Sequence, residues 1–123
     1  MTMRFGFHAA GSVILGSVLL LSTTAFAQKV EPSPENISKG EAIYKKHCLM
    51  CHGATGMGDG PAGKRLNPKP YNFQDKEKMA AETDEHLLKE ITKGKGPMPA
   101  FERKLKENER WMVLHYIRTF ANR

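Results

Sequence analysis

The residues of this chain with the most specific chemistry are its two cysteines, Cys48 and Cys51, and the histidine that follows them, His52. Two thiols three positions apart can each form a thioether bond with a vinyl group on one edge of a porphyrin, and the adjacent imidazole can then ligate the iron. The Cys-x-x-Cys-His pattern therefore predicts one covalently attached haem c, with Cys48 and Cys51 as attachment residues and His52 as an iron ligand.

Other roles for the cysteine pair fit the sequence less well. A structural zinc site needs about four ligands, and the chain has no second cysteine pair. A redox-active dithiol usually lies near a βαβ unit, and no β-rich run is found near Cys48. A disulfide between Cys48 and Cys51 would close a very short loop and stabilise the fold little. Haem attachment is the favoured interpretation.

A haem iron ligated by one histidine has a second axial position. Five methionines beyond residue 27 are candidates for it: Met50, Met57, Met79, Met98 and Met112. Met98 is favoured because Pro97 and Pro99 restrict the backbone on both sides and remove two amide donors. Met98 could instead fill a gap in a loop. His86 and His115 are further candidates, although both fall on expected helices at positions that favour the surface.

The first 27 residues have the pattern of a secretory signal peptide: a basic start at Arg4, an apolar run over residues 9–21 and a small-x-small site at residues 25–27. The alternative is a membrane anchor. At about 1.5 Å per helical residue the apolar run spans about 20 Å, less than a hydrocarbon core of about 30 Å. We therefore expect residues 1–27 to be a signal peptide and the protein to be exported to the periplasm.

The mature chain is expected to hold an extended lead-in at residues 28–36 and one domain at residues 37–123. Its 96 residues carry 18 basic and 13 acidic side chains, a formal charge of +5. A domain of this size has a small hydrophobic core, so a covalently held haem would form a large part of it. No membrane span is expected after signal removal, and no nucleic-acid partner is expected.

Hydrophobic periodicity predicts three main helices, over residues 38–50, 84–93 and 107–120, with a shorter helical turn over residues 75–81. Polar N-cap residues precede the first two helices and a glycine follows each: Asn36 or Ser38, Thr83, Gly53 and Gly94. No alternating strand pattern is present, so the expected fold class is all-α. The Gly- and Pro-rich segment 53–73 predicts a loop, either a flexible surface loop or a wrap around one haem edge.

Taken together, these residues resemble a known family. Over residues 37–120 the chain resembles the class I single-haem c-type cytochromes, in three motifs: Cys48–Gly53, Gly96–Phe101 and Trp111–Arg118. The resemblance implies a small cytochrome c fold, with about three main helices wrapped around one covalently attached haem. It also implies that His52 is the proximal iron ligand and Met98 the distal one.

The same resemblance implies two structural details. The first and last helices of this family cross closely, and Gly40 and Tyr44 match the first helix while Val113 and Tyr116 match the last. A proline carbonyl after the haem motif also holds the histidine ring in this family. The candidates here are Pro61, which is the best match, Pro68 and Pro70.

The leading functional interpretation is a soluble, monomeric electron carrier that is not an enzyme and whose haem iron cycles between Fe(III) and Fe(II). Ligands on both faces would keep substrates from the iron, which argues against a peroxidase. The alternative is a haem-bearing electron-transfer subunit of a larger periplasmic oxidoreductase complex. Elution of the mature protein as a free monomer would favour the carrier.

Redox partner proteins are expected in either case, and two lysine pairs bear on their charge: Lys45 with Lys46, and Lys93 with Lys95. Both pairs are expected near the haem edge. Together with the net positive charge, they could steer a partner that has an acidic docking surface. Ordinary solvated surface positions explain them equally well.

Overall fold

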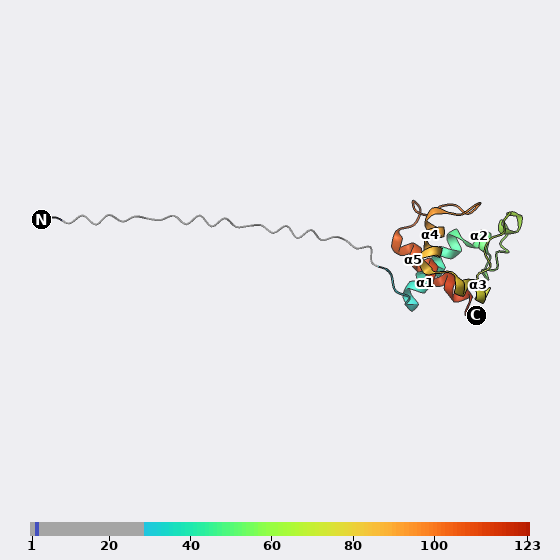
Figure 1. Ribbon diagram of the computed structural model, residues 1–123, viewed down its shortest axis with the longest axis horizontal. Helices are drawn as coiled ribbons and strands as arrows, with labels where there is room; N and C mark the ends of the chain where they lie inside the picture. The colour runs from blue at the N-terminus through green and yellow to red at the C-terminus, as the bar shows by residue number, and fades with distance from the viewer. Residues whose placement is uncertain (1, 3–28) are drawn as a thin grey trace.

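A computed structural model of the protein describes Thr2 and residues 29–123 (Figure 1). The expected signal peptide, residues 1–27, lies outside the described residues except for Thr2. The helices are α1 (Pro34–His47), α2 (Leu49–His52), the 3₁₀ helix η1 (Gly63–Arg65), α3 (Lys76–Ala81), α4 (Asp84–Lys93) and α5 (Glu107–Phe120). Residues 29–123 form no named strand, and the all-α fold class is confirmed. Among the described helices, none has the length and hydrophobicity to span a membrane.

The most extensive packing joins α1 to α5, the first and last helices of the domain, and α4 packs beside α5 (Figure 1). Gly40 lets the two helices approach closely, because a Cβ atom at this position would collide with the carbonyl oxygen of Met112. Tyr44 is fully buried, and its ring lies 5.3 Å from the ring of Tyr116 and 5.2 Å from that of Phe120. The close crossing implied by the family resemblance is therefore present.

Helix α1 begins at Pro34, four residues earlier than expected. The Ser33 hydroxyl accepts a hydrogen bond from the Asn36 backbone N–H at 3.1 Å, and proline suits the first turn of a helix because it has no N–H to leave unpaired. The helix ends at His47, and the separate turn α2 carries Cys51 and His52. The extended lead-in is correspondingly shorter and covers residues 29–33 of the described chain.

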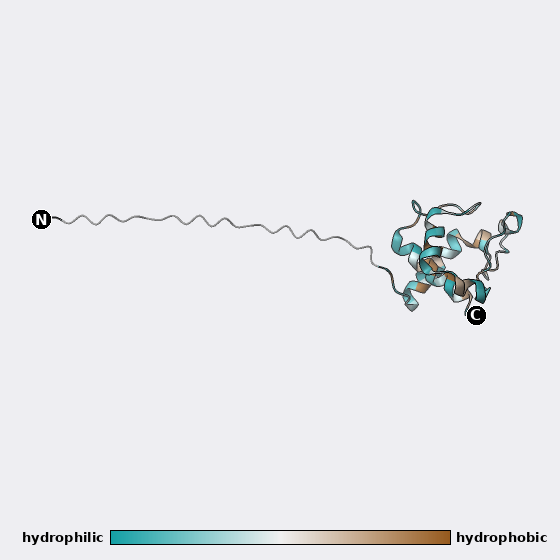
Figure 2. Ribbon diagram, in the orientation of Figure 1, coloured by the Kyte–Doolittle hydropathy of each residue, from teal (hydrophilic) through white to brown (hydrophobic). Residues whose placement is uncertain are grey.

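The bounds expected for the two later main helices match α4 and α5. Thr83 caps α4, because its hydroxyl accepts from the His86 backbone N–H at 3.1 Å. Helix α5 has no Ser or Thr cap, and the Glu109 carboxylate accepts from the Lys106 backbone N–H at 2.7 Å instead. The short turn around residues 75–81 is also confirmed as α3. In Figure 2 the hydrophobic residues fall mainly on the helices, and the long loops are mainly hydrophilic.

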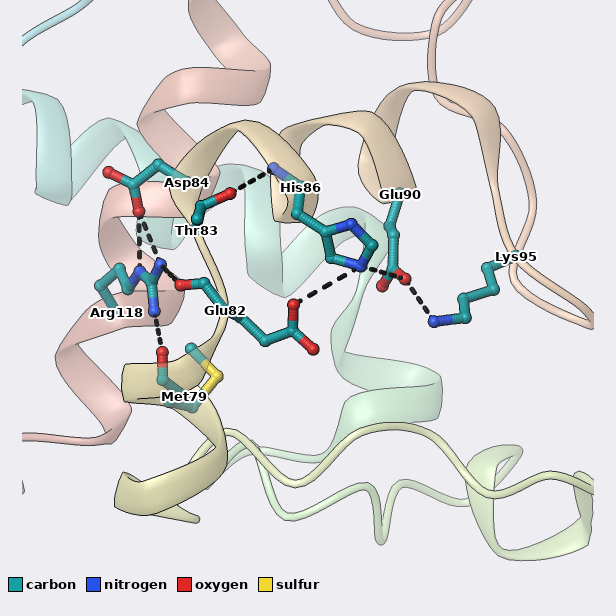
Figure 3. A network of polar contacts seen from close by, with 8 residues as sticks. All are labelled: Met79, Glu82, Thr83, Asp84, His86, Glu90, Lys95 and Arg118. Carbon is teal, nitrogen blue, oxygen red and sulfur yellow. Dashed lines mark hydrogen bonds and ion pairs between the residues drawn. The ribbon is translucent and has the colours of Figure 1, made fainter.

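Arg118 of α5 fixes the junction between α3 and α4 (Figure 3). Its guanidinium donates to the Asp84 carboxylate at 2.8 Å, to the Glu82 carbonyl oxygen at 2.6 Å and to the Met79 carbonyl oxygen. Because two of these acceptors are backbone carbonyls, the contacts orient the chain itself as it enters α4. These contacts, together with the apolar packing of Leu87 and Ile91 in the core, hold α4 beside α5.

Candidate cofactor site

A cavity of about 360 Å³ lies between α2, α4, α5 and the two long loops. The four residues singled out from the sequence, Cys48, Cys51, His52 and Met98, all line it. Much of the remaining lining is apolar and comes from α4 and α5: Leu87, Ile91, Val113, Leu114 and Ile117. The fold thus gathers two thiols, an imidazole and a thioether from separate segments around one largely apolar space.

His52 is 8% exposed, and its ring stacks on Phe73 with the ring centroids 4.6 Å apart. Burial lowers the pKa of the imidazole, and the backbone of Tyr71 beside the ring opposes part of that shift. The ring is therefore neutral near pH 7, which is the form that ligates iron. Its Nδ1 atom is buried without a hydrogen-bond partner in the described part of the chain. Buried polar atoms are normally satisfied, so this one fits a site that is completed by a bound group.

Both cysteines are free thiols that line the cavity. Burial, with a smaller contribution from Cys51, raises the pKa of the Cys48 thiol to about 12. No group of three or more His, Cys, Asp or Glu side chains within residues 29–123 is arranged to hold a metal ion by itself. A haem brings its own four nitrogen ligands, so the residues present fit a haem better than a protein-only metal site.

Met98 lies on a tight turn between α4 and α5. The backbone N–H of Met98 donates to the Lys95 carbonyl at 3.0 Å, and the N–H of Lys95 donates to the Met98 carbonyl at 3.1 Å. Gly94 and Gly96 have φ angles of 75° and 57°, which glycine adopts without strain. An ion pair between Lys95 and Glu90 joins the turn to α4 (Figure 3). The turn therefore holds the half-buried Met98 side chain at the cavity.

The other methionines lie away from the cavity lining. Met50 and Met57 are exposed, whereas Met79 is fully buried in the core. Met112 is half-buried on α5. Of the five methionines in the described part of the chain, Met98 is the one that lines the cavity.

The two histidines weighed as alternative ligands also lie outside the cavity lining. His86 is on the exposed face of α4, with its Nε2 atom 3.0 Å from a Glu90 carboxylate oxygen and 3.5 Å from one of Glu82 (Figure 3). His115 was expected at the surface, and this expectation is wrong. Its side chain is buried, and its Nε2 atom lies 2.6 Å from the Val30 carbonyl oxygen, so it fastens the N-terminal segment to α5.

The Gly- and Pro-rich loop forms one wall of the cavity through Leu66, Pro68, Pro70, Tyr71 and Phe73. Pro61, the proline that best matched the family pattern, is exposed and does not line the cavity. The backbone that lies beside the His52 ring is that of Tyr71, directly after Pro70. The Pro70–Tyr71 segment therefore lies nearer to the His52 ring than the exposed Pro61, which is outside the cavity lining.

Sequence reasoning missed several residues that shape this site. His47 lines the cavity and meets Phe101 edge-on, with ring centroids 6.1 Å apart. The Tyr44 hydroxyl donates to the Gly53 carbonyl oxygen at 2.7 Å and so fixes the end of α2 from the neighbouring helix. The position of His47 directly before Cys48 was a usable signal. No sequence signal indicated that Phe73 stacks on His52, because this contact depends on the path of the loop that carries Phe73.

Comparison with known protein families finds a match over residues 35–117. It is to the family model described as cytochrome c oxidase, cbb3-type, subunit III. This range includes all of α2, η1, α3 and α4, most of α1 and α5, and the four candidate site residues.

The relatives found among characterised proteins include two cytochromes c6. That of Synechocystis sp. (strain PCC 6803) is 26% identical over 113 residues, which are 92% of this chain and 83% of the relative. That of Leptolyngbya boryana is 30% identical over 78 residues, which are 63% of this chain and 85% of the relative. Cytochrome c oxidase subunit 2 of Bacillus sp. (strain PS3) is 40% identical over 53 residues, 42% of this chain but only 15% of that protein.

Two solved structures share the fold. A chain of the Kuenenia stuttgartiensis reducing HAO-like protein complex Kustc0457/Kustc0458 is 28% identical, with a TM-score of 0.67. That match covers 77% of the present chain and 48% of the other, so the present chain spans about half of its length. The KustC0563 c-type cytochrome is 30% identical, with a TM-score of 0.57, and the match covers 66% of the present chain and 95% of the other.

Proposed function

The chain belongs to the c-type cytochrome family described as subunit III of cbb3-type cytochrome c oxidase, and we propose that it is an exported single-haem electron-transfer protein. Like other members of the c-type cytochromes, it carries covalently attached haem c and transfers electrons through it. Export, the residues that hold the haem and the free-standing role of the protein are parts of the proposal.

The observation that carries the proposal is the convergence of four side chains on one cavity. Cys48 and Cys51 would form the thioether bonds, and His52 and Met98 would supply the two protein ligands of the iron. Cys48, Cys51 and His52 belong to one contiguous motif at the end of α1 and in α2, and the fold brings Met98 to them from the distant turn after α4. The haem, when bound, supplies the one-electron couple between Fe(III) and Fe(II).

The protein residues set the properties of that couple. The neutral imidazole of His52 and the thioether of Met98 would leave no iron position free for a substrate, which supports electron transfer and argues against catalysis at the iron. A thioether ligand and an apolar cavity both favour Fe(II) and raise the midpoint potential. The packing of the Met98 turn against α4 would limit movement of the ligand as the iron changes charge.

A location outside the cytoplasmic membrane is supported by the signal-peptide pattern of residues 1–27 and by the attachment motif itself. Similar cytochrome c domains occur in small cytochromes and in oxidase subunits. The compartment therefore does not by itself distinguish a free carrier from a complex subunit.

Membership of a larger periplasmic oxidoreductase complex is the second candidate function. The matching family model is described as an oxidase subunit, one relative is an oxidase subunit, and one similar structure is a chain of a protein complex. Against a permanent subunit, the large hydrophobic side chains exposed in the described part of the chain are limited to Met50 and Met57. Permanent interfaces usually bury more apolar surface than two side chains supply, so the free carrier is favoured.

The test is to express the full chain in a bacterium with a working haem-attachment system and to purify the exported protein. The free carrier predicts an intact mass equal to the chain from Gln28 plus one haem, a low-spin spectrum in both oxidation states and elution as a monomer. A mass without haem would overturn the proposal. Elution only as part of a larger assembly would establish the second candidate instead.

A further inference from the structure

The turn that carries Met98 is attached to α4 most firmly at its base. There the Phe101 backbone N–H donates to the Ile91 carbonyl at 3.1 Å. The Glu102 backbone N–H likewise donates to the Thr92 carbonyl at 3.1 Å. These two backbone hydrogen bonds fix the chain that follows Met98 to the last turn of α4.

The tip of the turn, residues 95–98, is attached differently. Its backbone hydrogen bonds join Lys95 to Met98 and so stay inside the tip. A Cβ atom added at Gly96 would meet no other atom within 4 Å, so this part of the tip borders open space. Within the described residues, the hydrogen bond that leaves the tip runs from the Lys95 ammonium to the Glu90 carboxylate (Figure 3). The tip is therefore held by this contact and by the apolar packing of the Met98 side chain.

Glu90 is itself held in place on α4. Its side chain is 21% exposed, and the oxygen that accepts from Lys95 also lies 3.0 Å from His86 Nε2 (Figure 3). A side chain that is already confined loses little further conformational freedom when it binds the tip. Glu90 also lines the cavity, and it is the only acidic residue among the described residues that do so. One carboxylate thus borders both the cofactor site and the turn.

A second ion pair at the end of α4 lacks these features. Lys93 Nζ lies 2.8 Å from the Glu102 carboxylate, but both side chains are more than half exposed and neither lines the cavity. The backbone of Glu102 is already fixed to α4 by its own hydrogen bond. Ion pairs between two exposed side chains contribute little. This pair is therefore a matched control, with the same charges but no contact with the tip.

We propose that Glu90 is a positioning residue for the distal iron ligand, which acts through Lys95 to keep the Met98 thioether on the iron. The inference rests on the proposed electron-transfer function and adds to it a residue of α4 that is not itself a ligand. Without the contact, the tip can move away from α4 and the thioether leaves the iron more readily. The effect is larger in Fe(III), because a thioether ligand favours Fe(II).

Imidazole binding to the oxidised, haem-loaded protein measures how firmly the thioether is held. An entering imidazole displaces Met98: the iron–sulfur bond breaks, an iron–nitrogen bond forms, and the oxidation state of the iron does not change. Both ligands are neutral, so the exchange leaves the net charge of the site unchanged. The imidazole affinity, obtained by titration of the visible spectrum, therefore reports the release of Met98 with little contribution from nearby charges.

Glu90→Met and Lys95→Met should each raise the imidazole affinity about threefold or more. The double variant should raise it no further than the larger single effect, because both substitutions break the same contact. Glu90→Gln keeps an acceptor for Lys95, so its effect should be smaller than that of Glu90→Met. In the control pair, Lys93→Met and Glu102→Met should each change the affinity by less than about 1.5-fold.

Three results would overturn the positioning role. A raised affinity in Lys95→Met with no change in Glu90→Met would mean that another acidic group, such as a haem carboxylate, holds the lysine. Effects that multiply in the double variant would mean that the two side chains act independently. Equal effects in the control pair would mean that the position of Glu90 is not what matters.

Midpoint potentials separate positioning from charge. Electrostatics alone would raise the potential when the Glu90 carboxylate is lost and lower it when the Lys95 ammonium is lost. Such opposite shifts with unchanged imidazole affinities would show that the pair acts on the iron by charge only, and the proposal would be wrong. Equal imidazole affinities in the wild-type protein and Met98→Ala would contradict the ligand assignment and the positioning role with it. Failure of the Glu90 variants alone would leave the proposed function intact.

Discussion

At the scale of single residues, the site is defined by how each candidate ligand is held. His52 is stacked on Phe73 and buried, so its ring has little rotational freedom and stays neutral near pH 7. Met98 is held differently, by a tight turn with glycines at both positive-φ positions and by the Lys95–Glu90 ion pair. The histidine is positioned by packing, and the methionine by backbone geometry.

Replacing Met98 is the sharpest test at this scale. Met98→Ala should open the sixth iron position to water, lower the midpoint potential and allow carbon monoxide to bind, because the thioether ligand is lost. Peroxidase activity should rise for the same reason. Visible spectra in both oxidation states, redox titration and carbon monoxide binding measure the outcome.

Met57→Ala is the control, since Met57 is exposed and lies outside the cavity lining. It should keep the low-spin spectrum and the midpoint potential. Met79→Ala should also keep the ligation, but it should lower the free energy of unfolding by about 2–5 kcal/mol because the side chain is fully buried. A six-coordinate spectrum and an unchanged potential in Met98→Ala would show that another residue is the ligand.

The residues that could be predicted are those whose chemistry is encoded by local spacing. Cys48, Cys51 and His52 form a contiguous motif, and the two prolines around Met98 mark its loop as rigid. Phe73 and His115 could not be placed in the same way, because their environments depend on which distant segments fold against them. His115 was misplaced for this reason, since its partner, the Val30 carbonyl, is 85 positions away in the sequence.

At the scale of secondary-structure elements, the helices are placed by a few contacts that do not resemble ordinary core packing. Gly40 permits the crossing of α1 and α5 through the absence of a side chain. Arg118 joins α5 to the α3–α4 junction through one carboxylate and two backbone carbonyls. These contacts join α5 to α1 and to the start of α4, and α4 and α5 supply much of the apolar cavity lining.

Arg118→Met should lower the free energy of unfolding by about 2–3 kcal/mol, because it leaves the Asp84 carboxylate and two carbonyls without their donor. Chemical denaturation of the haem-loaded protein measures the change. Arg103→Met removes the same charge from an exposed position and should alter the stability by less than about 0.5 kcal/mol. Similar losses in both variants would mean that the Arg118 contacts contribute nothing specific.

Gly40→Ala should force α1 and α5 apart, because the new Cβ atom would meet the Met112 carbonyl oxygen in the rigid backbone of the facing helix. We expect a loss of about 2–3 kcal/mol, typical of overpacking in a core. Ser38→Ala, at an exposed position of the same helix, is the matched control and should be nearly neutral. Gly40→Ala should melt at a lower temperature than Ser38→Ala. Equal melting temperatures would contradict the close crossing of α1 and α5.

Helix bounds were predictable where the cap residue and the terminating glycine both lie next to the hydrophobic pattern, as for Thr83 and Gly94 around α4. The start of α1 could not be predicted in this way, because the prolines around Ser33 and Pro34 indicate an extended segment. Proline at the first helical position follows the opposite rule from proline inside a helix. The 3₁₀ helix η1 was hidden by the high glycine and proline content around it.

At the scale of the whole molecule, the haem is both the functional group and a large part of the core. The cavity of about 360 Å³ is bordered by both long loops and by the faces of α4 and α5. Its largely apolar lining would otherwise face water, at a cost of about 25 cal/mol for each Å² of apolar surface. Folding and cofactor attachment should therefore depend on each other.

Cys48→Ala and Cys51→Ala each remove one thioether bond, and each should reduce the yield of haem-loaded protein severely. The chain that is recovered without haem should be largely unfolded, because its small core lacks the cofactor. Intact mass of the exported chain and far-ultraviolet circular dichroism measure the two effects. Wild-type yields of folded, haem-bearing Cys48→Ala would show that the first cysteine is not an attachment residue.

The crossing of α1 with α5 also dictates the order in which the protein can be assembled. A core that needs its last 14-residue helix cannot form while the chain is still emerging from the ribosome or being threaded through a translocon, because α5 arrives last. In the proposed export, the attachment segment would enter the destination compartment before α5. In the folded chain, burial raises the pKa of the half-buried Cys48 thiol to about 12, which disfavours the reactive thiolate form. Because α5 follows the attachment segment in the chain, the α1–α5 crossing forms only after that segment has been synthesised, and we expect covalent loading to begin before the core is complete.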